Sequence, residues 1–300
     1  MKFSSKLIGF STLLLAANIS AEEYRIVSPH HDDALLVFSG YISSLNLSNE
    51  NDERIVDVMF GASNYSTNHL DVLTDKRVLT ITKARYAEDY DALTELFTGW
   101  DKFKFRSYGY YDAPLRKYKG DVTAGGGPAG TFKNFRQIEI DTFNMMVHNF
   151  TSILKRDNCT LLVPIANGTH IDHFMTKEAV ITAAYRLGNQ AKCKIKFGQD
   201  QPYTDANPQN VNIEIEALKA RLPNGAITEE VYDIPLEPGT NETIKLNKFK
   251  KHYVTQYDTG YIGPLTSNLQ EVVYVWNPET YGQVKSHRHC DGSSYCTLAP

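Results

Sequence analysis

Short apolar runs alternate with longer amphipathic segments through the first two thirds of the chain. The runs are rich in β-branched and aromatic residues, as strands are, and lie at 24–28, 54–63, 103–110, 160–166 and 192–200. The amphipathic segments have the three- and four-residue apolar spacing of helices and lie at 34–45, 74–98, 135–155 and 174–187. Strands that alternate with such helices pair in parallel through right-handed crossovers. The pattern therefore predicts an α/β protein with a doubly wound, mostly parallel, Rossmann-like sheet.

The last third of the chain is less regular. Residues 213–222 and 242–257 have helical spacing, 272–276 read as a strand, and the earlier stretch DVTAGGGPAGTF at 121–132 predicts a loop. No linker or shift in composition separates this part from the rest. We therefore expect one domain over residues 22–300, with 205–300 as a C-terminal elaboration.

The first 21 residues, MKFSSKLIGFSTLLLAANISA, are typical of a secretory signal peptide. Two lysines precede an apolar run at 7–17, and a small residue, Ala21, ends the segment. The run is shorter than the ~20 apolar residues of a membrane span, although an uncleaved anchor is the alternative. We expect a secreted or periplasmic protein that has no stable membrane span after cleavage.

The net charge and the cysteine content limit the binding partners and the cellular compartment that we expect for this protein. Loss of Lys2 and Lys6 with the signal peptide takes the formal net charge from −4 to −6, so a nucleic-acid partner is not expected. An oxidising compartment permits disulfides among the four cysteines. Cys290 and Cys296 could close a short polar loop, whereas Cys159 and Cys193 could pair only if the strands they open are parallel neighbours.

Titratable side chains are concentrated directly after two predicted strands. SPHHDDA, at 28–34, follows the first strand, and NGTHIDH, at 167–173, follows the strand at 160–166. Ligands of open α/β sheets bind outside the carboxyl ends of the strands, where the strand order reverses. We expect both clusters to open onto the same edge of the sheet.

Two imidazoles and one carboxylate can hold a catalytic zinc ion with a position left for water, and His30, Asp33 and His173 are the candidates. Water activation also needs a base and a group that stabilises the oxyanion. Asp32 can be the base, and His170 can be a protonated donor to the oxyanion.

The two clusters resemble motifs of the PIG-L/LmbE family of zinc-dependent N-acetylglucosamine de-N-acetylases, namely His-Pro-Asp-Asp after the first strand and a later His-x-Asp-His. The matching stretches are HHDD at 30–33 and HIDH at 170–173. The resemblance implies Zn²⁺, or another divalent metal such as Fe²⁺, on His30, Asp33 and His173. It further implies that Asp32 is the general base, that His170 is the oxyanion partner, and that Asp172 orients His170 or another site group.

Weaker matches extend the resemblance over residues 24 to about 256. RYAE at 85–88 is similar to an Arg-x-x-Glu motif whose arginine reaches the sugar or its substituent, which implies substrate contact by Arg85. Asp112 is similar to an aspartate that binds sugar hydroxyls. DQPY at 200–203 and KFKKHYVTQ at 248–256 are similar to an Asp-x-Pro-Tyr motif and to a lysine-rich helix that ends in Thr/Ser-Gln.

Two positions depart from the family pattern. His31 replaces a proline and loosens the loop, and it adds a metal ligand or a substrate contact. Ala34 replaces a glutamate, and we expect weaker metal affinity from the loss of this carboxylate near the ligands.

Structural roles are the alternative for each motif. HHDD could cap a helix N-terminus, Arg85 and Glu88 could form an exposed intrahelical ion pair, and Asp112 could cap a turn before Pro114. Asp200 and Tyr203 could order their loop instead of acting in catalysis.

The sequence as a whole predicts a secreted hydrolase that removes the acetyl group from an N-acetylated amino sugar or glycan of the GlcNAc type. Two alternatives remain, a metal-dependent hydrolase of another amide or an ester, and a non-catalytic carbohydrate-binding protein.

Overall fold

The computed structural model describes residues 21–45, 51–65, 74–97, 103–116, 137–168, 170–256, 269–289 and 297–299. Its strands are β1 (Glu23–Ser28), β2 (Glu53–Val58), β3 (Phe103–Ser107), β4 (Cys159–Pro164), β5 (Lys194–Gly198), β6 (Ile227–Asp233), β7 (Gln270–Trp276), β8 (His287–His289) and β9 (Thr297–Ala299). Its α-helices are α1 (Asp33–Leu45), α2 (Asp75–Leu96), α3 (Gln137–Leu154), α4 (Ile171–Leu187), α5 (Tyr203–Ala206), α6 (Pro208–Ala220) and α7 (Ile244–His252). Two 3₁₀ helices lie at Gly188–Gln190 and Pro278–Gln283.

Seven strands form one sheet in the order β3-β2-β1-β4-β5-β7-β6. The strands β1 to β5 are parallel, and the order reverses between β1 and β4. β7 is antiparallel to both β5 and β6. The predicted doubly wound, mostly parallel fold is therefore confirmed, with one addition: β6 at the edge was not predicted, because most of its residues are exposed or half-buried and no apolar run marks it.

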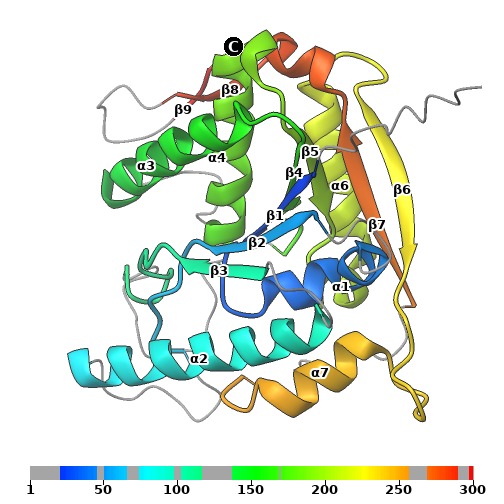
Figure 1. The fold of residues 1–300 in the computed structure, drawn as a ribbon. Coiled ribbons are helices and arrows are strands. Elements are labelled where there is room, and N and C mark those ends of the chain that lie inside the picture. The colour runs from blue at the N-terminus through cyan, green and yellow to red at the C-terminus, as the bar shows by residue number, and fades with distance from the viewer. Residues whose placement is uncertain are drawn as a thin grey trace, which may run out of the picture.

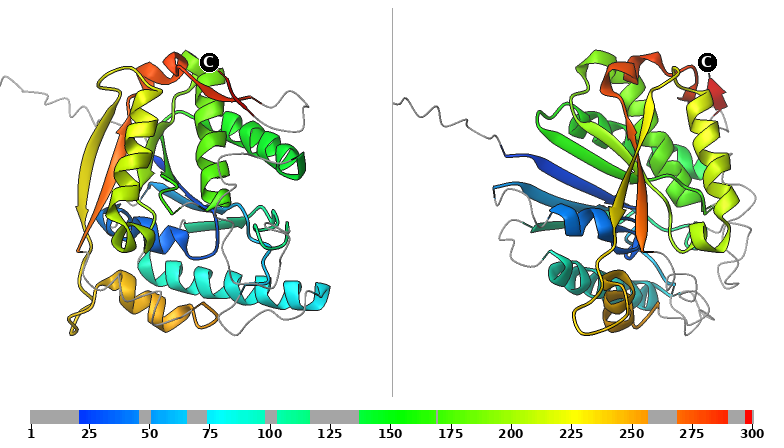
Figure 2. Two further views of the ribbon diagram at one scale, coloured as in Figure 1. Left: turned by 180° about the vertical axis from the view of Figure 1, so that it is seen from behind. Right: turned by 90° about the vertical axis from the view of Figure 1, so that its right-hand side faces the viewer.

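Helices cover both faces of the sheet (Figures 1 and 2). α1, α2 and α7 lie on one face, and α3, α4 and α6 lie on the other. Each layer has its own apolar core, and the strands supply side chains to both, as Val27 and Ile26 do on opposite sides of β1. This burial on both faces explains why the parallel strands appear as near-continuous apolar runs in the sequence.

A disulfide joins Cys159, the first residue of β4, to Cys193, the residue before β5. The two strands are neighbours and parallel, which is the condition that the sequence set for this pairing. Cys290 and Cys296 lie outside the described residues, as do the first 20 residues and the loop at 121–132. In the part of the chain that the structure describes, none of the helices combines the length and the apolar character that a membrane-spanning segment needs.

Candidate metal centre and active site

The loop between β1 and α1 folds tightly around its own polar groups. Ser28 Oγ donates to the His30 carbonyl at 2.6 Å and accepts from the Ala34 N–H at 2.9 Å. The Asp33 carboxylate accepts from the His30 N–H at 2.8 Å. Asp32 has a φ of 155°, a conformation that non-glycine residues rarely adopt and that concentrates at functional sites. The loop thereby brings ligand atoms of His30, Asp32 and Asp33 within 4.8 Å of one another.

The loop after β4 delivers the second cluster at the start of α4. His170 is the N-cap of this helix, and its Nδ1 accepts from the Asp172 N–H at 3.2 Å. His173 lies in the first turn of α4 and is buried. Both loops thus open at the carboxyl ends of β1 and β4, where the strand order reverses, as expected.

The two loops bring His30, Asp33 and His173 together. Asp33 Oδ2 lies 3.3 Å from His30 Nδ1 and 3.2 Å from His173 Nε2. A tetrahedral metal site with bonds of ~2.1 Å separates its ligand atoms by ~3.4 Å, so the separation of Asp33 from each histidine nitrogen is that of two ligands of one cation. Nitrogens of His30, His170 and His173 also lie within 4.8 Å of one another, which makes His170 a neighbour of the same position. The ligand roles themselves stay predictions.

The ionisable groups of this cluster shift one another's pKa values. Despite burial, hydrogen bonds to Asp172 and Asp33 raise the pKa of His30 to about 9, and the Asp33 and Asp200 carboxylates hold the pKa of His173 well above its ordinary value. The two imidazoles in turn hold the pKa of Asp33 far below its usual range, again against the effect of burial. Protons and a divalent cation therefore compete for the same nitrogens.

Asp32 is the carboxylate with a pKa suited to proton transfer. Burial, together with the neighbouring Asp33 charge, raises its pKa to about 7. Arg85 Nη2 lies 3.8 Å from its carboxylate and acts in the opposite direction. A carboxyl group that titrates near neutral pH can both accept and return a proton, as the predicted general base must.

The surroundings of His170 disfavour the protonated form of its ring. Burial and the positive charge of His30, whose ring centroid is 4.6 Å away, place the pKa of His170 well below its ordinary value. Because Nδ1 accepts the Asp172 N–H, a neutral ring carries its proton on Nε2. His170 can therefore donate one hydrogen bond to an oxyanion without being charged.

Asp172 contacts His30, a site group other than His170. Its Oδ2 lies 2.9 Å from His30 Nε2 and also accepts from the Ala113 N–H at 2.9 Å. Its Oδ1 accepts from Arg116 Nη2 at 2.5 Å. This leaves His30 Nδ1 directed toward Asp33, since a ring nitrogen held by a carboxylate fixes the orientation of the other.

The structure does not bring His31 to the candidate ligand set. Its ring is buried, stacks on Phe105 at a centroid distance of 6.0 Å, and places Nδ1 3.5 Å from Asp89 Oδ2. Asp112 is also buried, and its Oδ1 accepts from the Leu115 N–H, as the turn-capping alternative expects. Burial raises the pKa of Asp112, while Ser63 and the charge of His30 act against that rise.

Arg85 and Glu88 do not pair with each other. Arg85 is buried and donates to Ser63 Oγ at 3.0 Å and to Gln256 Oε1 at 2.7 Å. The Glu88 carboxylate accepts from the N–H and the hydroxyl of Thr255, each at 2.7 Å. The exposed ion pair offered as an alternative is thus not observed, and both residues instead fasten α2 to the segment after α7.

Three further residues support the site. Gln256 Nε2 donates to the His31 carbonyl at 2.9 Å, and Asp200 Oδ1 lies 3.5 Å from His173 Nδ1. The sequence motifs contained both residues but gave them no such role. No pattern in the sequence pointed to Arg116. Its contacts in the structure, Asp172 and Glu139, are remote from it in the sequence.

Comparisons with known proteins agree with this architecture. Neither the scan against protein-family models nor the search of curated proteins gives a match. Among solved structures, a deacetylase of the teicoplanin biosynthesis pathway has a TM-score of 0.54 and 16% sequence identity, over 84% of this chain and 97% of that one. The zinc inhibited form of teicoplanin deacetylase gives the same values. A deacetylase of the A40926 pseudoaglycone has a TM-score of 0.53 and 20% identity, over 85% and 97%.

At these levels of identity the similarity establishes the architecture, and it does so over most of each chain. The protein thus has the α/β fold of these deacetylases, which is the fold implied by its resemblance to the PIG-L/LmbE family.

Proposed function

We propose that this protein is a metal-dependent hydrolase that removes the acetyl group from an N-acetylated amino sugar of the GlcNAc type. The observation that carries the proposal is that Asp33 Oδ2 lies 3.3 Å from His30 Nδ1 and 3.2 Å from His173 Nε2, with Asp32 beside them at the point where the strand order reverses. The deacetylases that share the fold support the choice of reaction.

His30 Nδ1, Asp33 Oδ2 and His173 Nε2 would hold the cation, which we propose to be Zn²⁺, with Fe²⁺ as the alternative. A zinc inhibited form of a protein with the same fold supports the ability of this architecture to take zinc. A cation bound there would polarise the amide carbonyl and lower the pKa of a nearby water.

The protein groups would then handle the protons and the developing charge. Asp32 takes the proton of the attacking water, and His170 donates its Nε2 hydrogen to the carbonyl oxygen as that oxygen becomes negative. Asp32 next gives its proton to the leaving nitrogen as the C–N bond breaks, so that acetate and the free amine are the products. Arg85, 3.8 Å from Asp32, favours the ionised base at the start of the cycle.

We also propose that the protein is exported. The first 21 residues support this with the pattern of a secretory signal. The disulfide between Cys159 and Cys193 supports it independently, since structural disulfides persist mainly in oxidising compartments.

A substrate panel tests the reaction. Purified protein is incubated with N-acetylglucosamine, its glycosides and its oligomers, and acetate and free amine are both quantified. We expect both products from at least one sugar, their loss on chelation, and their return with added Zn²⁺ or Fe²⁺. If another amide or an ester is cut while acetate never forms from any sugar, the proposal is wrong and the first alternative holds.

The Asp32→Asn variant separates the enzyme from a sugar-binding protein. Loss of a general base lowers the rate by about 10²-fold or more, while elemental analysis should still find the metal. Asp91→Asn, on the exposed side of α2, is the matched control. Glycan binding that survives chelation, together with no turnover in the wild-type protein, would instead favour the non-catalytic alternative.

A further inference from the structure

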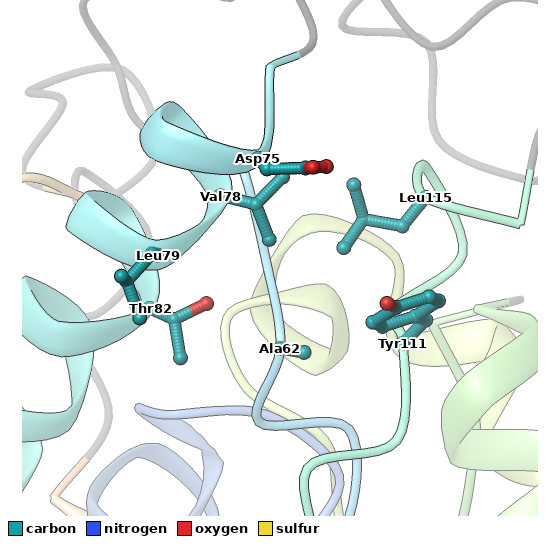
Figure 3. A pocket seen from close by; sticks show the side chains of 7 residues that line it. All are labelled: Ala62, Asp75, Val78, Leu79, Thr82, Tyr111 and Leu115. Atoms are coloured by element: carbon teal, nitrogen blue, oxygen red, sulfur yellow. The ribbon is translucent and has the colours of Figure 1, made fainter.

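An apolar cavity of about 350 Å³ lies next to the candidate active site. α2 supplies one wall, the loop after β3 supplies the opposite wall, and the segment after β2 lies between them (Figure 3). The lining side chains are Ala62, Asp75, Val78, Leu79, Thr82, Tyr111 and Leu115.

Large apolar groups on this surface remain open to solvent within the described structure. Leu79 exposes 55% of its surface and Tyr111 exposes 61%. In Figure 3 the side chains of Val78 and Leu115 approach the hollow from opposite walls. Single exposed apolar residues need no explanation, but several around one hollow mark a surface that can bind an apolar group.

Short contacts connect the cavity wall to the proposed base. Thr82 Oγ1 accepts from the Ser63 N–H at 3.0 Å, and Ser63 Oγ accepts from Arg85 Nη1 at 3.0 Å. Arg85 in turn lies 3.8 Å from Asp32. On the other wall, Tyr111 directly precedes the buried Asp112. Two residues, Ser63 and Arg85, thus connect the cavity wall to Asp32.

We propose that this cavity is a second substrate subsite that binds an apolar aglycone, aromatic or aliphatic, carried by the amino sugar. The inference rests on the proposed deacetylase function and specifies its substrate class. A second sugar would need partners for each of its hydroxyls, whereas the polar side chains among the seven lining residues are those of Asp75, Thr82 and Tyr111. The volume lies in the range of small-molecule sites, which are mostly apolar with few polar groups.

The contribution of this subsite to catalysis can be measured by comparing two substrates that differ only in the aglycone. Burial of one aromatic ring is worth about 30-fold in affinity, so kcat/KM for the phenyl β-glycoside of N-acetylglucosamine should exceed that for the free sugar by about this factor. The Leu79→Ser variant should reduce this ratio severalfold. Leu269→Ser is the matched control, because Leu269 is 54% exposed, lies outside the cavity, and should leave the ratio unchanged. An equal ratio in the wild type and in Leu79→Ser would overturn the subsite.

Calorimetric binding of the phenyl glycoside to the Asp32→Asn protein, with and without Leu79→Ser, gives a readout independent of turnover. Weaker binding in the double variant supports the subsite even if no acetate forms, in which case the proposed reaction alone fails. Deacetylation without preference for the glycoside, and without an effect of Leu79→Ser, refutes the subsite and leaves the proposed reaction standing.

Discussion

Replacement of Arg116 by methionine should destabilise the fold strongly. The guanidinium is buried between the fully buried carboxylates of Asp172, at 2.5 Å, and Glu139, at 3.4 Å, and it lies 5.0 Å from the Phe60 ring centroid. Methionine keeps most of the apolar stem, so the change removes mainly the charge and the hydrogen bonds. Both buried carboxylates then lose the charge of the guanidinium, and breaking a buried pair in this way costs about 3–5 kcal/mol.

Urea unfolding of the metal-free protein, in excess chelator at pH 7, measures this loss. Arg156→Met is the control, because Arg156 pairs with Glu23 at 2.7 Å but is half exposed, and such a pair contributes less than about 1 kcal/mol. Arg116→Lys should recover part of the stability by restoring the charge. If Arg116→Met unfolds within about 1 kcal/mol of the wild type, the reasoning from its burial and its two carboxylates is refuted.

The same substitution should weaken metal binding by about 10- to 100-fold, measured by competition with a chromophoric chelator, because Asp172 would no longer be held against His30. A variant that is less stable but binds metal as tightly as the wild type would separate the structural role of Arg116 from the orientation of His30.

Three further predictions concern other parts of the molecule. Removal of the disulfide by Cys159→Ala and Cys193→Ala, which opens a loop with a sequence separation of 34, should lower the free energy of unfolding by about 4 kcal/mol, and an unchanged urea midpoint would contradict it. Asp32→Gly should give a higher melting temperature than Asp32→Asn although both lose activity, because both remove the buried carboxylate and only glycine relieves the strain at φ 155°; equal melting temperatures would contradict the strain. Lys251 and its neighbours lower the pKa of Glu95 from 4.5 to about 2, so this stabilisation is present above pH ~4.5 and disappears as the pH falls toward ~2. The urea midpoints of the wild type and of Glu95→Gln should therefore converge over that range, and a constant difference would be inconsistent with the pairing.

The parallel part of the fold was predictable because its strands are buried on both faces. Such strands appear as apolar runs, and the helices between them have their own spacing. β6 could not be found in this way. Every side chain of its sequence ITEEVYD is exposed or partly buried, and its partner β7 lies about 40 residues later in the chain, beyond any local pattern.

The candidate ligands were predictable because each cluster is contiguous in sequence and follows a strand end. The direction in which each side chain of the loop points was not predictable from the sequence. His31 lies between two site residues, yet its ring turns toward α2 and Phe105. The supporting residues were hidden for another reason: Arg116 and its partner Asp172 are 56 residues apart, and Gln256 and His31 are 225 residues apart.

The hydrogen bond from Gln256 to the His31 carbonyl joins the segment after α7 to the loop that carries three of the proposed site residues, His30, Asp32 and Asp33. The neighbouring residue, Thr255, donates two hydrogen bonds to Glu88 of α2. The segment after α7 can therefore detach from the rest of the structure only if several hydrogen bonds break together. Any ligand that steadies the β1–α1 loop must therefore also slow the local opening of the segment after α7. Amide hydrogen exchange around residues 253–256 would then report occupancy of a site to which those residues contribute no ligand atom.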